Sequence, residues 1–140
     1  MLERAFVDSN VLIYAHDPEA GDKQRIAARL LQELWSSRNG VLSIQVLQEF
    51  YNTITRKVRP AARREIAREL IRVYSSWTIQ AVAADDVVSA SLIEERYNLS
   101  FWDALIVQAA HAAGARLLLS EDFSHGQSIA GVRIENPFAR

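Results

Sequence analysis

The chain has 140 residues, of which 49% are hydrophobic and 24% are charged. This composition excludes an intrinsically disordered chain and predicts a single globular domain. The sequence contains no cysteine, which excludes disulfide bonds, thiol nucleophiles and zinc–thiolate sites. No apolar run reaches the roughly 18 residues of a membrane span, and the N-terminus lacks the pattern of a signal peptide, so we expect a cytoplasmic protein without a membrane partner.

Positive charge is concentrated in one part of a chain whose formal net charge is only −1. The basic residues of this part fall between positions 56 and 72: Arg56, Lys57, Arg59, Arg63, Arg64, Arg68 and Arg72. A local basic patch can attract nucleic acid even on a neutral protein, because phosphate contacts act at short range. The alternative is a solvated helix face in which Glu65 and Glu69 pair with some of the arginines, and composition alone favours it.

The first forty residues predict one strand followed by two helices. Residues 5–8 form a short apolar run that ends in an acid, which indicates a buried parallel strand. A short helix is expected to begin with residues 11–14, after capping side chains at 9–10, and to stop at Pro18. A longer helix is expected at 22–38, and Asn39-Gly40 suits its left-handed end. Its apolar residues recur at helical spacing: Ile26, Leu30, Leu31 and Leu34.

The next segment predicts a strand and two further helices. Residues 41–43 indicate the second strand, and Ser43 is expected to cap a helix that runs to about Lys57. The buried stripe of that helix is expected at Val46, Leu47, Phe50 and Ile54. Pro60 is expected to open the Arg-rich helix, which runs to about Ser75. Its buried positions are expected at Ile66, Leu70 and Val73 or Tyr74.

The last third of the chain completes an alternation of strands and helices. A third strand is expected at 78–82, where β-branched residues are frequent. Helices follow, one capped by Asp85 and one capped by Ser100. Residues 116–120 indicate a buried fourth strand, and Val132–Glu135 a short fifth at an edge.

Strands that alternate with helices predict an α/β fold with a central parallel sheet. We expect one domain over residues 1–140, with four to five strands and helices on both faces of the sheet. No internal repeat or linker interrupts the pattern. The segments 22–38 and 60–75 are expected to project over an edge of the sheet.

Four separated acids are the candidate catalytic and metal-binding residues: Asp8, Glu49, Asp103 and Asp122. In open parallel sheets, ligands bind beyond the carboxyl ends of the strands. Asp8 ends the first expected strand and Asp122 follows the fourth, while Glu49 and Asp103 lie in helices beside strands. An acid at the end of an apolar strand is costly to bury unless a partner or a metal neutralises it, so Asp8 is the strongest candidate.

Each of the other three acids has a structural alternative. Asp103 stands three residues after Ser100, as in a capping box. Glu49 can lie on a solvated face of its helix, and Asp122 can cap a turn. The residues alone leave these alternatives open.

Four sequence motifs resemble those of PIN-domain proteins, in the same order and at similar spacing. They are Val7-Asp8-Ser9-Asn10 with the apolar residues that follow, the helical segment 43–50, the segment 101–106 and the segment 117–123. A single domain of this length is most similar to the VapC-type ribonuclease toxins of type II toxin–antitoxin systems. This resemblance covers nearly the whole chain.

The resemblance implies an α/β PIN-like fold and a Mg²⁺- or Mn²⁺-dependent endoribonuclease that cleaves RNA. It also implies a small cognate antitoxin as partner and a homodimer. We expect Asp8 and Asp103 to be the most direct metal ligands, with Glu49 and Asp122 binding through water or at a second metal. Ser9, Asn10 and Ser120 are expected to orient these groups from outside, and Glu121 is a weaker candidate for the same role.

Chemistry supports a metal at such a cluster. A hard divalent cation prefers carboxylate oxygens, neutralises a phosphodiester and lowers the pKa of its bound water. Without a cation, four converging acids repel one another, and at least one should take up a proton. A metal-free ribonuclease would need a pair of histidines, but nothing in the sequence brings His16, His111 and His125 together.

Two other enzyme classes fit the same residues less well, and two related functions fit them equally. An aspartate-centred phosphatase is disfavoured because Asn10 stands where its second acid is expected, and a receiver domain leaves Glu49 unexplained. A non-catalytic PIN module that binds RNA or protein, and a nuclease that acts on DNA, remain alternatives.

Overall fold

A single six-stranded sheet forms the centre of the protein, in a computed structural model that describes residues 3–139. Its strand order is β3-β2-β1-β4-β6-β5, and all neighbouring pairs are parallel except β5 and β6. The strands are β1 (Ala5–Val7), β2 (Gly40–Ser43), β3 (Thr78–Gln80), β4 (Leu117–Leu119), β5 (Ser128–Ile129) and β6 (Val132–Glu135).

The predicted α/β fold with a mainly parallel sheet is confirmed, but the predicted number of strands is wrong. β5 was missed because two residues carry no alternating pattern, and it pairs antiparallel with β6 across the turn at Gly131. The third strand ends at Gln80 instead of residue 82, and Val82 is exposed. β1 ends at Val7, so Asp8 is the residue that follows the strand.

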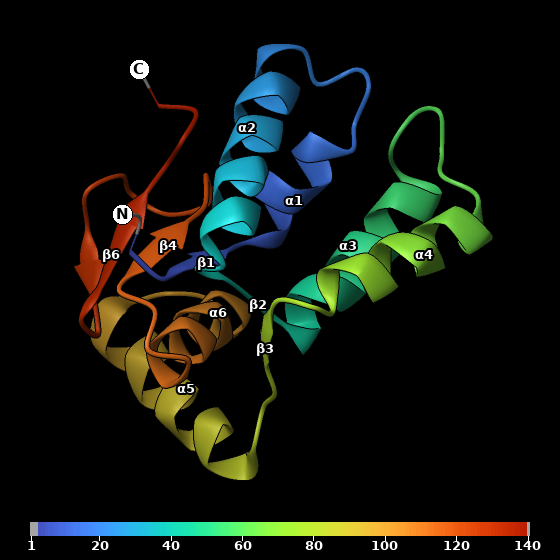
Figure 1. The fold of residues 1–140 in the computed structure, drawn as a ribbon. Coiled ribbons are helices and arrows are strands. Elements are labelled where there is room, and N and C mark those ends of the chain that lie inside the picture. Colours follow the sequence, from blue (N-terminus) through green and yellow to red (C-terminus); the bar gives the residue numbers. More distant parts are fainter. Residues whose placement is uncertain (1–2, 140) are drawn as a thin grey trace.

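Helices cover both faces of the sheet, as predicted. Figure 1 shows α1 and α2 on one face, α5 and α6 on the other, and α3 with α4 extending beyond the β2–β3 side. Their bounds are α1 (Ser9–Ala15), α2 (Asp22–Ser37), α3 (Ile44–Arg56), α4 (Arg64–Tyr74), α5 (Ala84–Tyr97) and α6 (Phe101–Ala112). The prediction that residues 22–38 and 60–75 project together is therefore wrong. Instead α2 packs on α1, and α3 and α4 form an arm that extends beyond the sheet.

Helix starts agree with the predicted caps where a hydroxyl side chain is available. Ser43 Oγ accepts a hydrogen bond from Val46 N, and Ser100 Oγ accepts one from Asp103 N. The Asp85 cap is wrong, because α5 begins after Ala83, whose N–H donates to the carboxylate of Asp86. α1 also begins earlier than expected, with Asp8 itself as the cap.

The Arg-rich helix differs most from its prediction. It starts at Arg64 instead of Pro60, and the residues between lie in a loop. Ile66 was expected in the core but is 46% exposed, and Ala67 is buried in its place, because α4 packs mainly on α3 and presents its small residue there. Of the two alternatives Val73 and Tyr74, Tyr74 is the buried one, and Val73 is 43% exposed.

The core lies between the sheet and its helices. The predicted stripe of α3 is fully confirmed, and Phe50 within it is completely buried. In α2, Leu31 and Leu34 are buried as expected, whereas Ile26 is 39% exposed and Ala27 takes its place. Aromatic rings stack edge-to-face at the junction of α2, α3 and α4: His16, Trp35, Phe50, Tyr74 and Trp77.

Candidate active site

Neighbouring strands bring Asp8 and Ser120 together at one edge of the sheet. β1 and β4 pair in parallel with Val7 opposite Leu119, so the residues that follow both strands emerge side by side. The Asp8 N–H donates to the Leu119 carbonyl over 3.0 Å and extends the ladder by one bond. This pairing joins residues 112 positions apart, as the rule for parallel sheets predicts.

The carboxylate of Asp8 is buried and hydrogen-bonded on both oxygens. Its Oδ1 accepts from the Ser9 N–H at 2.7 Å, and its Oδ2 accepts from Ser120 Oγ at 2.8 Å. Only 3% of the residue is exposed. Burial raises the pKa of Asp8 to about 7, and the negative charges of Asp122 and Glu49 add to the shift. These bonds reduce the penalty of a buried charge but do not remove it.

Asn10 connects the two loops that carry the acids. Its amide Nδ2 lies 3.1 Å from Asp122 Oδ2, 3.2 Å from Ser120 Oγ and 3.4 Å from Asp8 Oδ2. Its Oδ1 accepts from the Glu121 N–H at 3.2 Å. A single amide side chain therefore sets the distance between Asp8 and the loop that follows β4.

Ser120 completes this network from the opposite side. The residue is fully buried, and its hydroxyl accepts from the Asp122 N–H at 3.1 Å while it donates to Asp8. The side chains expected to orient the acids thus contact them directly.

Glu49 and Asp103 face the same site from α3 and α6. Partial burial raises the pKa of Glu49, and the charges of Asp103 and Asp122 raise it further, while a hydrogen bond with the Ser9 side chain opposes the shift. Partial burial also raises the pKa of Asp103, with Asp122 contributing repulsion and a hydrogen bond with Ser100 opposing it. Asp122 is therefore within electrostatic range of the other three predicted acids, and Glu49 is within range of Asp8 and Asp103.

These residues have the chemistry of a site for a hard divalent cation. All four offer carboxylate oxygens, and burial raises the pKa of three of them, with a further contribution from mutual repulsion. Within residues 3–139, no three acidic or histidine side chains form a ready-made metal-binding group. The donor set therefore fits Mg²⁺ or Mn²⁺ in its chemistry, whereas a closed coordination geometry is not preformed.

Glu121 points away from the four acids. Its Oε1 accepts from the Tyr14 hydroxyl at 2.5 Å, and its Oε2 pairs with Lys23 Nζ at 2.9 Å. Lys23 also lies over the Tyr14 ring, 4.9 Å from its centroid. No local pattern in the sequence relates Tyr14 or Lys23 to a residue about 100 positions later, so neither could be predicted. They tie α1 and α2 to the loop that carries Ser120 and Asp122.

We predict that Glu121→Gln changes any metal-dependent activity only a few-fold. The side chain contacts Tyr14 and Lys23, and its surface ion pair contributes about 1 kcal/mol or less. Activity and thermal unfolding of this variant, beside those of Asp122→Asn, are the measurement. A loss as large as that of Asp122→Asn would instead place Glu121 in the cluster of acids.

Ser120→Ala is expected to destabilise the protein by about 1–3 kcal/mol near neutral pH. The change leaves the buried Asp8 without one hydrogen bond and the Asp122 N–H without its acceptor. Urea unfolding of this variant measures the effect. Ser9→Ala is the control: it removes a hydroxyl that bonds to Glu49 and leaves both hydrogen bonds of Asp8 in place, so its loss should be smaller. Equal stability of Ser120→Ala and the unchanged protein would contradict the assigned network.

The three histidines occupy three different environments. His16 Nε2 lies 2.6 Å from the Tyr74 hydroxyl, and burial lowers the pKa of this histidine. His125 Nδ1 accepts from the Asn136 N–H, and His111 is exposed near the end of α6. Their placement agrees with the expectation that they are incidental to the acidic site.

The sequence matches a known protein family. Residues 5–126 match the model of the PIN domain, which is most of the chain. The protein therefore belongs to the PIN domain family. No curated protein matches the sequence.

Solved structures of toxins and toxin–antitoxin complexes share this fold. VapC20 of Mycobacterium tuberculosis, described as a toxin that cleaves the sarcin–ricin loop, is 24% identical with a TM-score of 0.67, over 92% of this chain and 98% of that one. A toxin–antitoxin complex from Klebsiella pneumoniae is 18% identical with a TM-score of 0.72, over 96% and 98%. VapBC2 of Rickettsia felis, bound to a promoter DNA fragment, is 18% identical with a TM-score of 0.63, over 94% and 97%.

Among the helices of residues 3–139, none combines the length and the apolar character of a membrane-spanning segment.

Proposed function

We propose that this protein is a Mg²⁺- or Mn²⁺-dependent endoribonuclease and the toxin of a VapBC-type toxin–antitoxin pair. The observation that carries the proposal is Asp8, a buried carboxylate whose pKa is raised to about 7 by burial and by the charges of Asp122 and Glu49. Such an arrangement opposes folding unless a cation neutralises it. Membership of the PIN domain family and the likeness to VapC structures support the choice of chemistry.

In this mechanism the four acids would bind the cation, and the side chains next to them would fix the positions of the acids. Asp8 and Asp103 are the proposed direct ligands, with Glu49 and Asp122 binding through water or at a second ion. When bound, the cation supplies charge neutralisation at the phosphodiester and lowers the pKa of its water. Ser120 and the Ser9 N–H fix the carboxylate of Asp8, and Asn10 fixes Asp122 beside it. Ordered ligands reduce the reorganisation that the reaction requires.

A small antitoxin is the proposed protein partner. The structural neighbours include toxin–antitoxin complexes, one from Klebsiella pneumoniae and one from Rickettsia felis. The acidic site favours an antitoxin that places an Arg or Lys near Asp8, where charge complementarity is greatest. A structure of the complex with no basic group near Asp8 would contradict this mode of inhibition.

A homodimer in the cytoplasm is also part of the proposal. Large apolar side chains are exposed beside the start of α6, including Trp102, which is 65% exposed, and Val82. Exposed aromatic groups are favoured at protein interfaces. Light scattering of the purified chain tests this, and a monomeric mass at micromolar concentration would contradict it.

Cleavage of an RNA panel with and without a chelator tests the enzymatic proposal. We expect cleavage with Mg²⁺ or Mn²⁺, none with excess chelator, and recovery when the metal is restored. Asp103→Asn should remain inactive at every metal concentration that restores the unchanged protein. Full activity of Asp103→Asn would refute the assignment of this ligand.

The second candidate is a non-catalytic PIN module that binds RNA or a protein. Calorimetry with Mn²⁺ separates the two, because an absence of binding at millimolar metal favours the module. Parallel assays on single-stranded DNA of the same sequence distinguish a ribonuclease from a DNA nuclease, since only RNA offers a 2′-hydroxyl.

A further inference from the structure

Positive charge is concentrated in the segment that begins at the C-terminal end of α3. Residues 56–72 carry seven basic and two acidic side chains, a formal charge of +5. Because the whole chain has a formal charge of −1, the remaining residues together carry −6. The positive charge therefore belongs to the end of α3, the loop that follows it and α4, which form the arm in Figure 1. We call these residues the basic arm.

Every basic side chain of this arm is exposed. Two of them form weak surface ion pairs, Arg63 with Glu65 at 3.6 Å and Arg72 with Glu69 at 3.3 Å. Arg56 bonds to the neutral side chains of Asn52 and Thr55. In the described part of the chain, no ion pair is recorded for Lys57, Arg59, Arg64 or Arg68. The pairing expected for a solvated helix face thus neutralises only a minority of the charge.

α3 leads directly from the acidic site to the arm. Glu49 lies on the same face of this helix as Asn52 and Arg56, which follow at intervals of three and seven residues. At 1.5 Å per residue, Arg56 is about 10 Å further along the helix axis than Glu49. The Ala62 N–H donates to the Ile54 carbonyl and holds the following loop against the end of α3. The path from acids to arginines therefore runs over one rigid element.

We propose that the basic arm binds the phosphate backbone of the RNA substrate and directs the strand along α3 to the acidic site. This inference rests on the proposed function for its substrate. The acids around Asp8 repel a polyanion, so attraction must come from another surface. The arm supplies that attraction through positively charged side chains, which contact phosphates whatever the base sequence is.

An acidic segment of a protein is the competing ligand of the basic arm. Different residues of the arm suit RNA and protein. Arg68 and Arg72 border an apolar groove formed with Ile44, Leu47 and Ile71, which suits a protein helix. Lys57, Arg59 and Arg64 do not line that groove. They lie at the end of α3, in the loop and at the start of α4, outside the groove, where exposed positive charge favours the phosphates of RNA.

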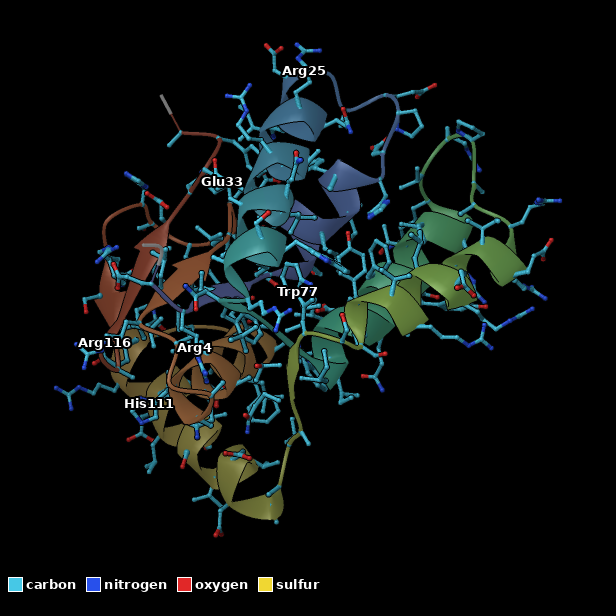
Figure 2. The ribbon with its side chains drawn as sticks, viewed as in Figure 1. Arg4, Arg25, Glu33, Trp77, His111 and Arg116 are labelled. Carbon is cyan, nitrogen blue, oxygen red and sulfur yellow. The ribbon has the colours of Figure 1, made fainter. Side chains whose placement is uncertain are left out.

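The test compares two triple variants in an Asp103→Asn background, which prevents cleavage. One carries Lys57→Gln, Arg59→Gln and Arg64→Gln. The control removes equal charge at Arg25, Arg29 and Arg116, which are also exposed. Figure 2 shows Arg25 at the start of α2 and Arg116 on the opposite side of the molecule from the arm. Fluorescence anisotropy with a labelled single-stranded RNA of about 20 nucleotides, long enough for several phosphate contacts, measures the affinity at several salt concentrations.

We expect the arm variant to bind on the order of 100-fold more weakly at about 0.1 M salt, with a salt slope smaller by about 2. The control should lose only a few-fold. Equal affinity of the two variants overturns the proposal. Weaker antitoxin binding with unchanged RNA binding also overturns it and assigns the surface to the protein partner.

The same variants distinguish this proposal from the proposed function. With Asp103 restored, the arm variant should cleave RNA with a raised KM and a nearly unchanged kcat. If the unchanged protein cleaves no RNA yet binds it through the arm, the enzymatic proposal fails and the basic arm stands. If the arm variant cleaves with an unchanged KM, the basic arm fails alone. Circular dichroism and thermal unfolding confirm that both variants fold.

Discussion

Asp8→Asn is expected to stabilise the metal-free protein while it removes RNA cleavage. Folding buries the Asp8 carboxylate and places it near Asp122 and Glu49, which raises its pKa from 3.8 to about 7. At pH 7 or above, that shift corresponds to a penalty of about 4 kcal/mol for the ionised form. Asparagine has a similar shape and no charge, so it avoids most of this penalty. Activity should fall at least about 100-fold, since charge at the reacting centre contributes that much in enzymes.

The pH dependence gives this prediction a definite sign. Between pH 4 and 7, Asp8 holds its proton in the folded state and loses it in the unfolded state. Stability therefore falls as the pH rises through this interval and changes no further above about 7. Asp8→Asn should lack this contribution, so its advantage should grow from pH 4 to pH 7.

Urea unfolding in a chelator, across this pH range, measures the difference. Asp122→Asn is the matched control, because Asp122 is exposed and its removal relieves repulsion without relieving burial. Added Mg²⁺ should stabilise the unchanged protein and leave Asp8→Asn nearly unaffected. If Asp8→Asn is less stable than the unchanged protein at pH 8 in chelator, the burial argument is wrong.

Gly40→Ala is expected to destabilise the protein by about 3 kcal/mol, near the upper end for overpacking. A Cβ at this position would lie 2.3 Å from a ring carbon of Trp77, closer than any real contact. The ring cannot withdraw easily, because Trp77 packs edge-to-face against Trp35 and Tyr74. Thermal unfolding should show a midpoint lower by roughly 10 °C.

A double-mutant cycle with Trp77→Leu separates this clash from a loss of glycine flexibility. The smaller side chain removes the obstructing ring, so Gly40→Ala should have little effect in that background. If alanine destabilises both backgrounds equally, the cause is the backbone of β2 and the proposed contact with Trp77 is wrong.

Local patterns in the sequence were sufficient for much of the fold. Capping by Ser43 and Ser100 and the buried stripe of α3 depend on residues within a few positions of one another. Parallel strands end at a common edge, which predicted that Asp8 and Asp122 lie near each other. The choice of Glu49, Asp103 and Asp122 over their structural alternatives depended on the resemblance of the four motifs to those of PIN-domain proteins. The choice of Asp8 as a site residue needed only physical chemistry, because an acid next to an apolar strand must be neutralised.

Sequence patterns gave wrong predictions where contacts with distant segments decide which face of a helix is buried. Ile66 and Val73 have the periodicity of a core face, but α4 packs on α3 through Ala67 and Tyr74. The cap at Asp85 failed because the carboxylate of Asp86 bonds to the Ala83 N–H. Asp86 stands at the third helical position, where it accepts from the Ala83 N–H and also from the side chain of Gln108, 22 residues further along the chain.

The sequence by itself determined the alternation of strands and helices, the acids at the ends of β1 and β4, and the excess of arginine in one segment. Periodicity, capping and charge are properties of neighbouring residues, so they can be seen without coordinates. Only the tertiary structure decided that Gly40 belongs to a strand beneath Trp77 instead of a helix end. It alone joined Glu121 to Tyr14 and Lys23, and it left the arginines exposed. Those contacts depend on the register of segments that meet only when the chain folds.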